Sequence, residues 1–316
     1  ERDYLLGNKH SFANGFEVAD ADVIIAAASP TEYRPKVPKA ASSGGKNEIC
    51  AKAYLDRLPC TITKKMPECV GDSFNFGNHY WTVSQKAVEK YKTDRNLNSI
   101  SKATGVKKRL PKDGPFDERN VKPYRSCAIV ASSKALRGKK LGAKIDNHEV
   151  VMRMNGAPTK GYEKHVGKKT TIRVQNIDNL GFREPKDEML VFTARDEKTF
   201  RHFSEYQKKQ FSKHGKEKTH IQRVFNPQFW CHVWDWVDRR KLKPSSGFAG
   251  VVLALRACSS KEKVSLYGFS HNATQFHYFN RLSEKVTEKE VYTYHPLAEE
   301  SEAYRFLSFH RRLVKN

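Results

Sequence analysis

The sequence lacks an apolar run long enough to cross a membrane. Its most apolar stretch near the start is "VIIAAA", which covers residues 23–28, whereas a membrane-spanning helix needs about 20 apolar residues in a row. A secretory leader is not visible either. We therefore expect any membrane anchor to lie outside this sequence of 316 residues.

Closely spaced cysteine pairs are also missing. No two of the six cysteines have the Cys-x-x-Cys spacing that zinc sites and thioredoxin-type redox motifs use. Dispersed cysteines in even number suit disulfides in an oxidising compartment, and they suit buried thiols in a cytosolic protein as well. Asn272-Ala273-Thr274 has the form of an N-glycosylation acceptor, which favours the secretory pathway weakly. The cysteines are Cys50, Cys60, Cys69, Cys127, Cys231 and Cys258.

Acidic residues are scarce relative to basic ones. The chain has 58 Lys and Arg against 35 Asp and Glu, which gives a formal net charge of +23. Such an excess predicts attraction to nucleic acid, a membrane surface or a polyanionic glycan. No basic helix, zinc-finger spacing or RNA-binding signature accompanies the charge, so a solvated basic surface or an acidic substrate is favoured over nucleic acid. The basic clusters lie at 107–109, 138–140, 167–169 and 239–243.

The composition divides the chain into two parts. Residues 29–46 are rich in Pro, Ser, Gly and Lys, which is typical of a linker or a surface arm. We therefore predict an N-terminal arm over 1–46 and one folded domain over 47–316. Within that domain, residues 78–91 are expected to form a short strand that runs into a helix.

From about residue 120, short apolar runs alternate with segments of helical spacing. This alternation predicts an α/β fold with a single, largely parallel central sheet flanked by helices, as in Rossmann-like nucleotide-binding domains. The predicted strands are 127–131, 149–153, 171–175, 189–194, 221–225 and 263–269. The predicted helices are 199–211, 227–240 and 247–258.

Polar and small residues follow several of the predicted strands. Ligands of open α/β sheets bind outside the carboxyl ends of the strands. Asn155 and Asn176 each come just after a strand, and Ala131-Ser132-Ser133 form a small-residue turn. Residues 244–247, "PSSG", precede an apolar helix and could present amides and hydroxyls to an anion. The glycine-rich dinucleotide fingerprint is absent, and each residue taken singly fits an ordinary cap or turn.

Taken together, these segments resemble the motifs of the eukaryotic sialyltransferases, glycosyltransferase family 29. Residues 127–176 are similar to the large sialylmotif of that family, and 244–270 to the small sialylmotif. "HYFN" at 277–280 resembles motif III, and "YHPLAEE" at 294–300 the very small motif. The four segments follow the family's order. "RMNGAP" and "YHPL" are most similar to the branch that sialylates galactose at its 6-hydroxyl.

The resemblance implies a catalytic domain over 47–316 with a nucleotide-binding fold of the GT-A variant type and a CMP-activated donor. It also implies a disulfide between Cys127 and Cys258 that ties the two large motifs together. Six residues would bind the donor through its cytidine, ribose and phosphate. They are Ser132, Asn155, Asn176, Ser246, Gly247 and His277.

The same resemblance makes His295 the general base of an inverting transfer of sialic acid to a glycan hydroxyl, with galactose as the expected acceptor sugar. A base near neutral pKa is needed because a sugar hydroxyl is a poor nucleophile, and histidine matches that need. Glu300 and Ser245 are expected to support the site. Arg153 is expected to be a structural ion-pair partner.

No cofactor or metal is expected, because amides at a helix start and a histidine can stabilise a leaving group with one phosphate. Asp20-Ala21-Asp22 has the form of a manganese motif, but it lies more than 100 residues before the nucleotide segment. We interpret these residues as a cap or as the start of a strand.

The expected partners are a CMP-sugar and a glycan that can itself be acidic, without nucleic acid. The family's members are anchored in the membrane, so the expected location is the Golgi lumen, as a type II membrane protein. One alternative is a related enzyme that uses CMP-Kdo as the donor for an acidic cell-wall polysaccharide. A second alternative is a non-catalytic lectin-like or nucleic-acid-binding protein.

Overall fold

The computed structural model describes the central part of the chain and shorter segments around it. The described residues are 82–86, 105–112, 124–185, 187–194, 197–214, 222–226, 229–230, 233–234, 236–237, 243–258, 264–269, 277–280, 295–297, 299–301 and 303–304. Several predictions lie outside them: the arm over 1–46, Asp20 and Asp22, the sequon at Asn272, and Cys50, Cys60, Cys69 and Cys231.

The core of the fold is one six-stranded sheet in which every neighbouring pair is parallel. The strand order is β5-β4-β3-β2-β1-β6. The first strand therefore lies inside the sheet, with β2 to β5 added on one side of it and β6 on the other. All six predicted strands are confirmed within a few residues. They are β1 (Cys127–Val130), β2 (Val150–Met154), β3 (Ile172–Gln175), β4 (Met189–Phe192), β5 (Gln222–Val224) and β6 (Val264–Tyr267).

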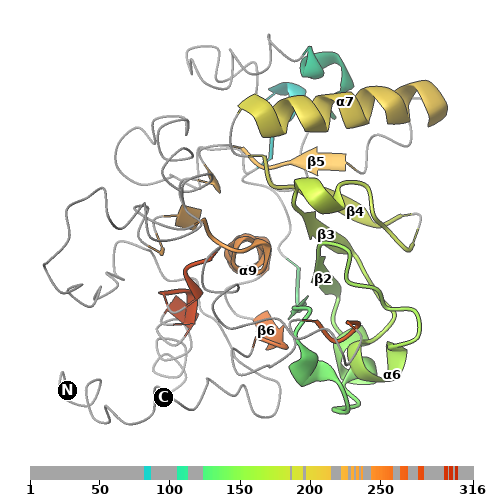
Figure 1. Ribbon diagram of the computed structural model, residues 1–316, viewed down its shortest axis with the longest axis vertical. Coiled ribbons are helices and arrows are strands. Elements are labelled where there is room, and N and C mark those ends of the chain that lie inside the picture. The colour runs from blue at the N-terminus through green and yellow to red at the C-terminus, as the bar shows by residue number, and fades with distance from the viewer. Residues whose placement is uncertain are drawn as a thin grey trace, which may run out of the picture.

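Both faces of the sheet are covered, which explains why its strands are continuous apolar runs rather than alternating patterns. Helix α9 (Ser246–Ala257) packs on one face. The short helices α5 (Gly142–Asp146) and α6 (Glu163–Val166) cover the other. Figure 1 shows α9 and α6 on opposite sides of the sheet, with α7 (Glu197–His214) lying beyond β5. The α/β architecture expected from the sequence is confirmed.

Two of the three predicted helices are confirmed. The one expected over 199–211 is α7, and the one expected over 247–258 is α9. Of the helix expected over 227–240, residues 229–230 and 233–234 are helical, whereas 236–237 form a turn. Of the segment 78–91, the structure describes residues 82–86, in which Thr82 forms an antiparallel bridge with Phe225 and Gln85 begins a helical turn.

Helix α9 runs antiparallel to the strands, and this places its N-terminus at their carboxyl ends. A Cβ on Gly250, near the helix start, would lie 2.6 Å from Met154 Cε at the end of β2. At the other end of α9, the amide of Tyr124 donates to Ala257 O at 3.0 Å, just before β1 begins. A side chain at position 250 would require the end of the Met154 side chain to move, so the backbone of α9 packs closely on Met154 here.

The expected disulfide between Cys127 and Cys258 is present, with the two Cα atoms 6.4 Å apart. It joins the start of β1 to the residue that caps α9. The bond therefore fixes the distal end of α9 against the amino ends of the strands.

Removing this bond should unfold the protein or abolish binding of CMP rather than slow turnover. The bond closes a loop of 131 residues, for which chain entropy gives about 4–5 kcal/mol, comparable with a whole domain's net stability. Cys258→Ala should therefore shift the urea midpoint strongly downward. Peptide mapping without reduction should recover a linked 127–258 peptide. Two alkylatable thiols at these positions in folded, CMP-binding protein would contradict the prediction.

Candidate active site

The two asparagines singled out in the sequence lie side by side at the carboxyl ends of β2 and β3. Asn155 follows β2 with a φ of 50°, a left-handed conformation that asparagine tolerates better than most residues. Its Oδ1 accepts a hydrogen bond from the amide of Asn176 at 3.0 Å. The Asn176 carboxamide oxygen in turn accepts from the amide of Asn179 at 3.2 Å and caps η5 (Ile177–Asn179). Both side chains are partly exposed.

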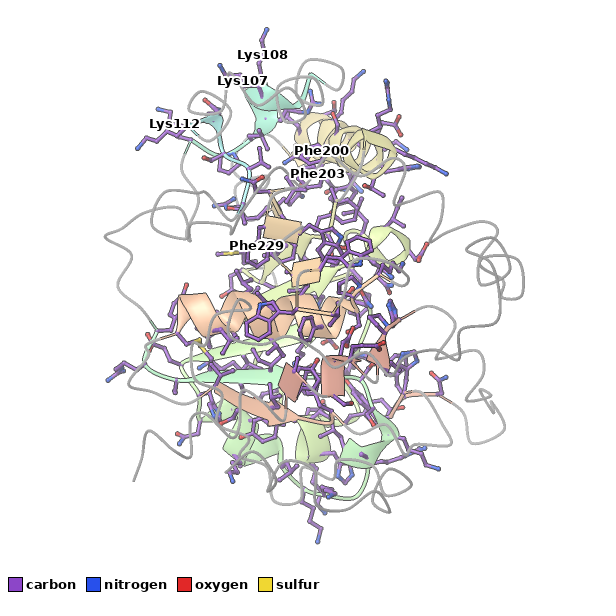
Figure 2. The ribbon with its side chains drawn as sticks, turned by 90° about the vertical axis from the view of Figure 1, so that its left-hand side faces the viewer. Lys107, Lys108, Lys112, Phe200, Phe203 and Phe229 are labelled. Atoms are coloured by element: carbon purple, nitrogen blue, oxygen red, sulfur yellow. A yellow bond between two sulfur atoms is a disulfide. The ribbon has the colours of Figure 1, made fainter. Side chains whose placement is uncertain are left out.

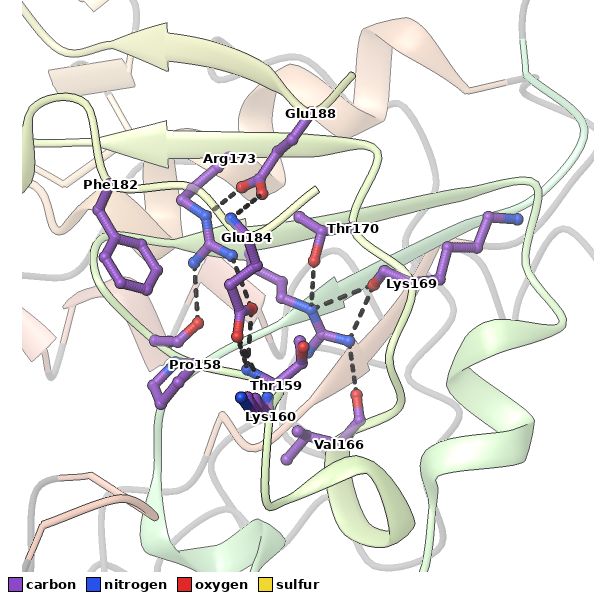
Figure 3. A network of polar contacts seen from close by, with 12 residues as sticks. Pro158, Thr159, Lys160, Val166, Lys169, Thr170, Arg173, Phe182, Glu184 and Glu188 are labelled. Atoms are coloured by element: carbon purple, nitrogen blue, oxygen red, sulfur yellow. Dashed lines mark hydrogen bonds and ion pairs between the residues drawn. The ribbon is translucent and has the colours of Figure 1, made fainter. Parts of the chain in front are cut away.

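A buried arginine holds the turn that carries Asn155. Arg173 in β3 is fully buried, and its Nη1 donates to Asn155 O at 3.0 Å and to Ala157 O at 2.8 Å. Its Nε pairs with Glu188, and its Nη2 lies 3.5 Å from Glu184 Oε2 (Figure 3). Burial raises the pKa of Glu188, and the charge of Arg173 opposes that rise. The turn after β2 is thus fixed by a buried ion pair.

Glu184 extends this network to the next residues of the same turn. Its carboxylate accepts from the amide of Thr159 at 2.9 Å and from that of Lys160 at 3.1 Å. Residues 155–160 are therefore held at their start by Arg173 and at their end by Glu184 (Figure 3).

The prediction that Arg153 is an ion-pair partner is wrong in its detail. Arg153 is fully buried, but its hydrogen bonds go to Val166 O at 2.6 Å, Lys169 O at 2.9 Å and Thr170 Oγ1 at 3.0 Å. Burial lowers its pKa to about 10. Arg153 is the register partner of Arg173 in β3, and of these two arginines it is Arg173 that pairs with carboxylates.

Ser132 and His277 come together at the end of β1. The carbonyl of Ser132 accepts from the amide of Tyr278 at 2.8 Å, which places the 277–280 segment against the turn after β1. His277 stacks on Phe279 with ring centroids 4.8 Å apart, and its Nδ1 lies 3.2 Å from Asn280 Oδ1.

The start of α9 forms the second part of the site. Ser245 Oγ accepts from the amide of Phe248 at 3.0 Å and caps the helix. Ser246 and Gly247 occupy the first turn and are partly exposed. Amides in the first turn of a helix have no intrahelical acceptor and lie at the positive end of the helix dipole. This end of α9 is therefore suited to bind an anion.

Glu300 and His295 are both anchored to the segment that leads into α9. The fully buried carboxylate of Glu300 accepts from Ser245 N at 2.7 Å and from Ser245 Oγ at 2.8 Å. His295 Nδ1 lies 2.9 Å from Lys243 O. Because a carbonyl only accepts, Nδ1 must carry the proton, and the lone pair of a neutral ring is then on Nε2.

The two parts of the site meet around the end of β6. Tyr267 O accepts from the amide of Ala131, which precedes Ser132, at 2.9 Å. Two residues after Tyr267, the ring of Phe269 lies 3.5 Å from the position of a Cβ on Gly247. The structure therefore brings the predicted donor residues to one edge of the sheet.

In the described part of the chain, no three His, Cys, Asp or Glu side chains lie close enough together to hold a metal ion. None of the helices in the same residues has the length and apolar character of a membrane span.

The sequence interpretation missed Arg173, Glu184 and Glu188, which shape the Asn155 turn. A signal was present, because an arginine in the middle of the apolar run "TIRVQ" must find partners when it is buried. Its partners could not be read from the sequence, since they depend on which strands become neighbours.

The fold is an α/β domain with a parallel sheet, and the candidate ligand site at the carboxyl ends of its strands combines asparagine side chains with a helix start. The sequence model of "Glycosyltransferase family 29 (sialyltransferase)" matches residues 72–311. The chain belongs to this family.

Its relatives include sialyltransferases of two linkage classes. A mouse protein named CMP-N-acetylneuraminate-beta-galactosamide-alpha-2,3-sialyltransferase 2 is 30% identical over 202 residues, 60% of this chain and 54% of the relative. Human beta-galactoside alpha-2,6-sialyltransferase 2 is 30% identical over 177 residues, 48% of this chain and 32% of the relative. The chain thus spans about half or less of the curated relatives it matches.

Solved structures agree on the fold. A crystal structure of a mammalian sialyltransferase in complex with Gal-beta-1-3GalNAc-ortho-nitrophenol matches with a TM-score of 0.57 and 22% identity, over 82% of this chain and 95% of that one.

The buried carboxyl of Glu300 should make stability depend on pH. Desolvation raises its pKa from 4.5 to about 7, against the hydrogen bonds from Ser245. The folded state therefore binds the proton more tightly, so the free energy of unfolding should fall as pH rises from about 4.5 to beyond 7.

Glu300→Gln should remove this contribution, while Glu299→Gln, on a partly exposed neighbour, should keep it. Urea midpoints of both variants and the parent at pH 5.5 and pH 8 measure the effect. An unchanged pH dependence in Glu300→Gln would show that the carboxyl stays ionised throughout.

Proposed function

We propose that this chain is the catalytic part of an inverting sialyltransferase that transfers sialic acid from CMP-sialic acid to a terminal sugar hydroxyl of a glycan, with galactose as the acceptor sugar. The observation that carries the proposal is the bond from His295 Nδ1 to Lys243 O. This bond fixes the tautomer of His295 and joins it to Lys243, which lies two residues before the cap of the helix start proposed as the anion site.

In this proposal the donor lies along the carboxyl edge of the sheet. Ser132, Asn155 and Asn176 contact the cytidine and ribose, which need neutral hydrogen-bonding groups. Ser246, Gly247 and the amides at the start of α9 bind the phosphate, and His277 gives it a further hydrogen bond. The hydrogen bonds made by Asn155, Asn176 and Ser245 hold these groups in place before the donor arrives, which reduces the cost of ordering them.

The transfer needs one proton acceptor and one stabilised leaving group. His295 Nε2 takes the proton of the acceptor hydroxyl as that oxygen attacks the anomeric carbon of sialic acid. The new carbon–oxygen bond forms on the face opposite the phosphate, the bond from carbon to the phosphate oxygen breaks, and CMP leaves with the electron pair. The single displacement inverts the anomeric carbon.

Ser245 and Glu300 act as positioning residues in this scheme. Their two hydrogen bonds connect the 295–301 segment to the cap of α9. They thereby keep the proposed base and the proposed phosphate site in register.

We also propose a luminal Golgi location for the catalytic domain of a type II membrane protein. The disulfide between Cys127 and Cys258 supports this proposal, because such bonds persist in oxidising compartments. A segment outside this chain would supply the anchor, and Asn272 would be glycosylated.

A second donor is worth testing because of the net charge of +23. A related enzyme that uses CMP-Kdo on an acidic polysaccharide would have a similar CMP site. A panel of CMP-sialic acid and CMP-Kdo, with transfer detected on a glycan array, separates the two. Transfer of sialic acid to galactose-terminated glycans supports the main proposal, and transfer of Kdo alone contradicts it.

His295→Ala should lower turnover by about 10²-fold or more, because the acceptor hydroxyl loses its base. The affinity for CMP should stay nearly unchanged, as measured by calorimetry. His165→Gln, a change at a partly exposed histidine on α6, is the matched control. Turnover within a few-fold of the parent in His295→Ala would exclude His295 as the base.

Activity should survive a strong chelator, because amides and a histidine stabilise the leaving phosphate in this scheme. Initial rates with and without excess chelator provide the measurement. Loss of activity that manganese restores would contradict the prediction and would direct attention to Asp20 and Asp22.

A further inference from the structure

The exposed side of α7 and the neighbouring 3-10 helix η3 (Val106–Arg109) carry a concentration of lysines. We call this the η3–α7 surface. Glu205 is the only acidic residue among the exposed side chains described on these two elements and the three residues that follow η3. Figure 2 shows Lys107, Lys108 and Lys112 extending outward beside α7 at one end of the molecule. The exposed lysines are Lys107, Lys108, Lys112, Lys198, Lys208, Lys209 and Lys213.

Packing of the other side of α7 fixes the direction in which these lysines point. Phe200 and Phe203 are buried, and Phe203 stacks on Phe192 of β4 with ring centroids 5.6 Å apart (Figure 2). Arg109 Nη2 donates to Ser204 Oγ at 2.6 Å, which joins η3 to the helix. Phe200 and Phe203 lie on the side of α7 that faces the core, whereas Lys198, Lys208, Lys209 and Lys213 are all exposed, so these lysines lie on the side that faces solvent.

The lysines are spread along the helix rather than gathered at one place. At 1.5 Å per residue, Lys198 and Lys213 are separated by about 22 Å along the helix. Lys209 and Lys213 are four residues apart, a like-charge spacing that destabilises a helix. Between them the surface is hollowed by a depression of about 630 Å³ lined by Glu205, Lys208, Lys209, Ser212 and Lys213. A row of this length suits an extended chain that carries several negative charges.

This surface is connected to the proposed donor site. Helix η5, which Asn176 caps, packs against α7. Gly181 follows η5 with a φ of 92°, and a Cβ there would lie 2.7 Å from the ring of Tyr206 in α7. The same turn therefore touches both the asparagine pair and the basic helix.

We propose that the η3–α7 surface binds the carboxylate-bearing chain of an acidic glycan acceptor, while the acceptor's terminal sugar lies at His295. This rests on the proposed function and names the substrate class of that site. Lysines attract a row of carboxylates electrostatically, and dissolved salt screens this attraction only in part. The surface would thus raise the affinity for acidic acceptors without taking part in the chemistry.

The side chains favour this occupant over a lipid surface or a nucleic acid. A helix that lies on a membrane offers bulky apolar residues to the lipid, whereas the apolar side of α7 packs into the core, and Phe211, at 39% exposure, is its one large apolar side chain described as exposed. Single-stranded nucleic acids stack on exposed aromatic rings, but Phe200 and Phe203 are buried.

The test compares charge reversal on this surface with charge reversal at the other end of the sheet. The variant is Lys208→Glu, Lys209→Glu and Lys213→Glu combined, in the full chain. The control is Lys139→Glu, Lys164→Glu and Lys168→Glu, all exposed lysines around η4 (Lys134–Leu136) and α6. Both change the net charge equally. The acceptors are galactose-terminated oligosaccharides with a uronic-acid chain or with a neutral chain of equal length.

In the variant, the KM for the acidic acceptor should rise about tenfold or more at low salt, and KM for the neutral acceptor should stay within about twofold. The control should match the parent with both acceptors. High salt should remove most of the parent's preference for the acidic acceptor. Equal KM values in variant and control would overturn the proposal.

Two further measurements separate this proposal from the proposed function. Hydrolysis of CMP-sialic acid without acceptor should be unchanged in the variant. If the parent transfers no sugar at all, the proposed function fails, and calorimetry with a galacturonate oligosaccharide decides the present proposal by itself. Parent binding that the variant lacks supports it. Equal binding by both, or tighter parent binding to phosphatidylserine vesicles or to single-stranded DNA than to the oligosaccharide, overturns it.

Discussion

The buried ion pair between Arg173 and Glu188 is the interaction on which the geometry of the candidate site depends. A buried guanidinium is costly unless it is paired and hydrogen-bonded. Here Arg173 Nη1 also donates to Asn155 O and Ala157 O, so the arginine that pairs with Glu188 also shapes the turn after β2. Together with the hydrogen bond from the Asn176 amide to Asn155 Oδ1, these bonds hold Asn155 in its left-handed conformation.

That constraint reaches the other half of the site through α9. Gly250 meets Met154 at the end of β2, so the helix is seated directly on the strand whose turn Arg173 holds. The helix is then fixed at both ends, by Glu300 at the cap residue Ser245 and by the disulfide at Cys258. A rigid helix between two anchors keeps its first-turn amides aimed at the same edge of the sheet as the asparagines, as preorganised binding of an anion requires.

The sequence predicts the sheet well because its strands are continuous apolar runs separated by helical spacing, a pattern that parallel order produces. It predicts the site through local signals, such as Asn155 after β2 and Ser245 before α9. It could not assign the partners of Arg153 and Arg173, which look alike in the sequence. Their difference arises from tertiary structure: Arg173 faces the carboxylates of Glu184 and Glu188, while Arg153 meets the carbonyls around Lys169.

The distribution of charge shows two ways of holding an anion in one molecule. At the candidate donor site, the residues at the ends of β1, β2 and β3 are a serine and two asparagines, and the proposed phosphate site is the start of α9 with His277. Hydrogen bonds from such groups are directional, which suits one donor molecule in one position. Along α7, flexible lysines present charge without fixed geometry, which suits a chain that has to shift as different acceptors bind. Under the two proposals, the positive charge along α7 serves acceptor binding rather than the chemical step, and the proposed donor residues include no lysine or arginine.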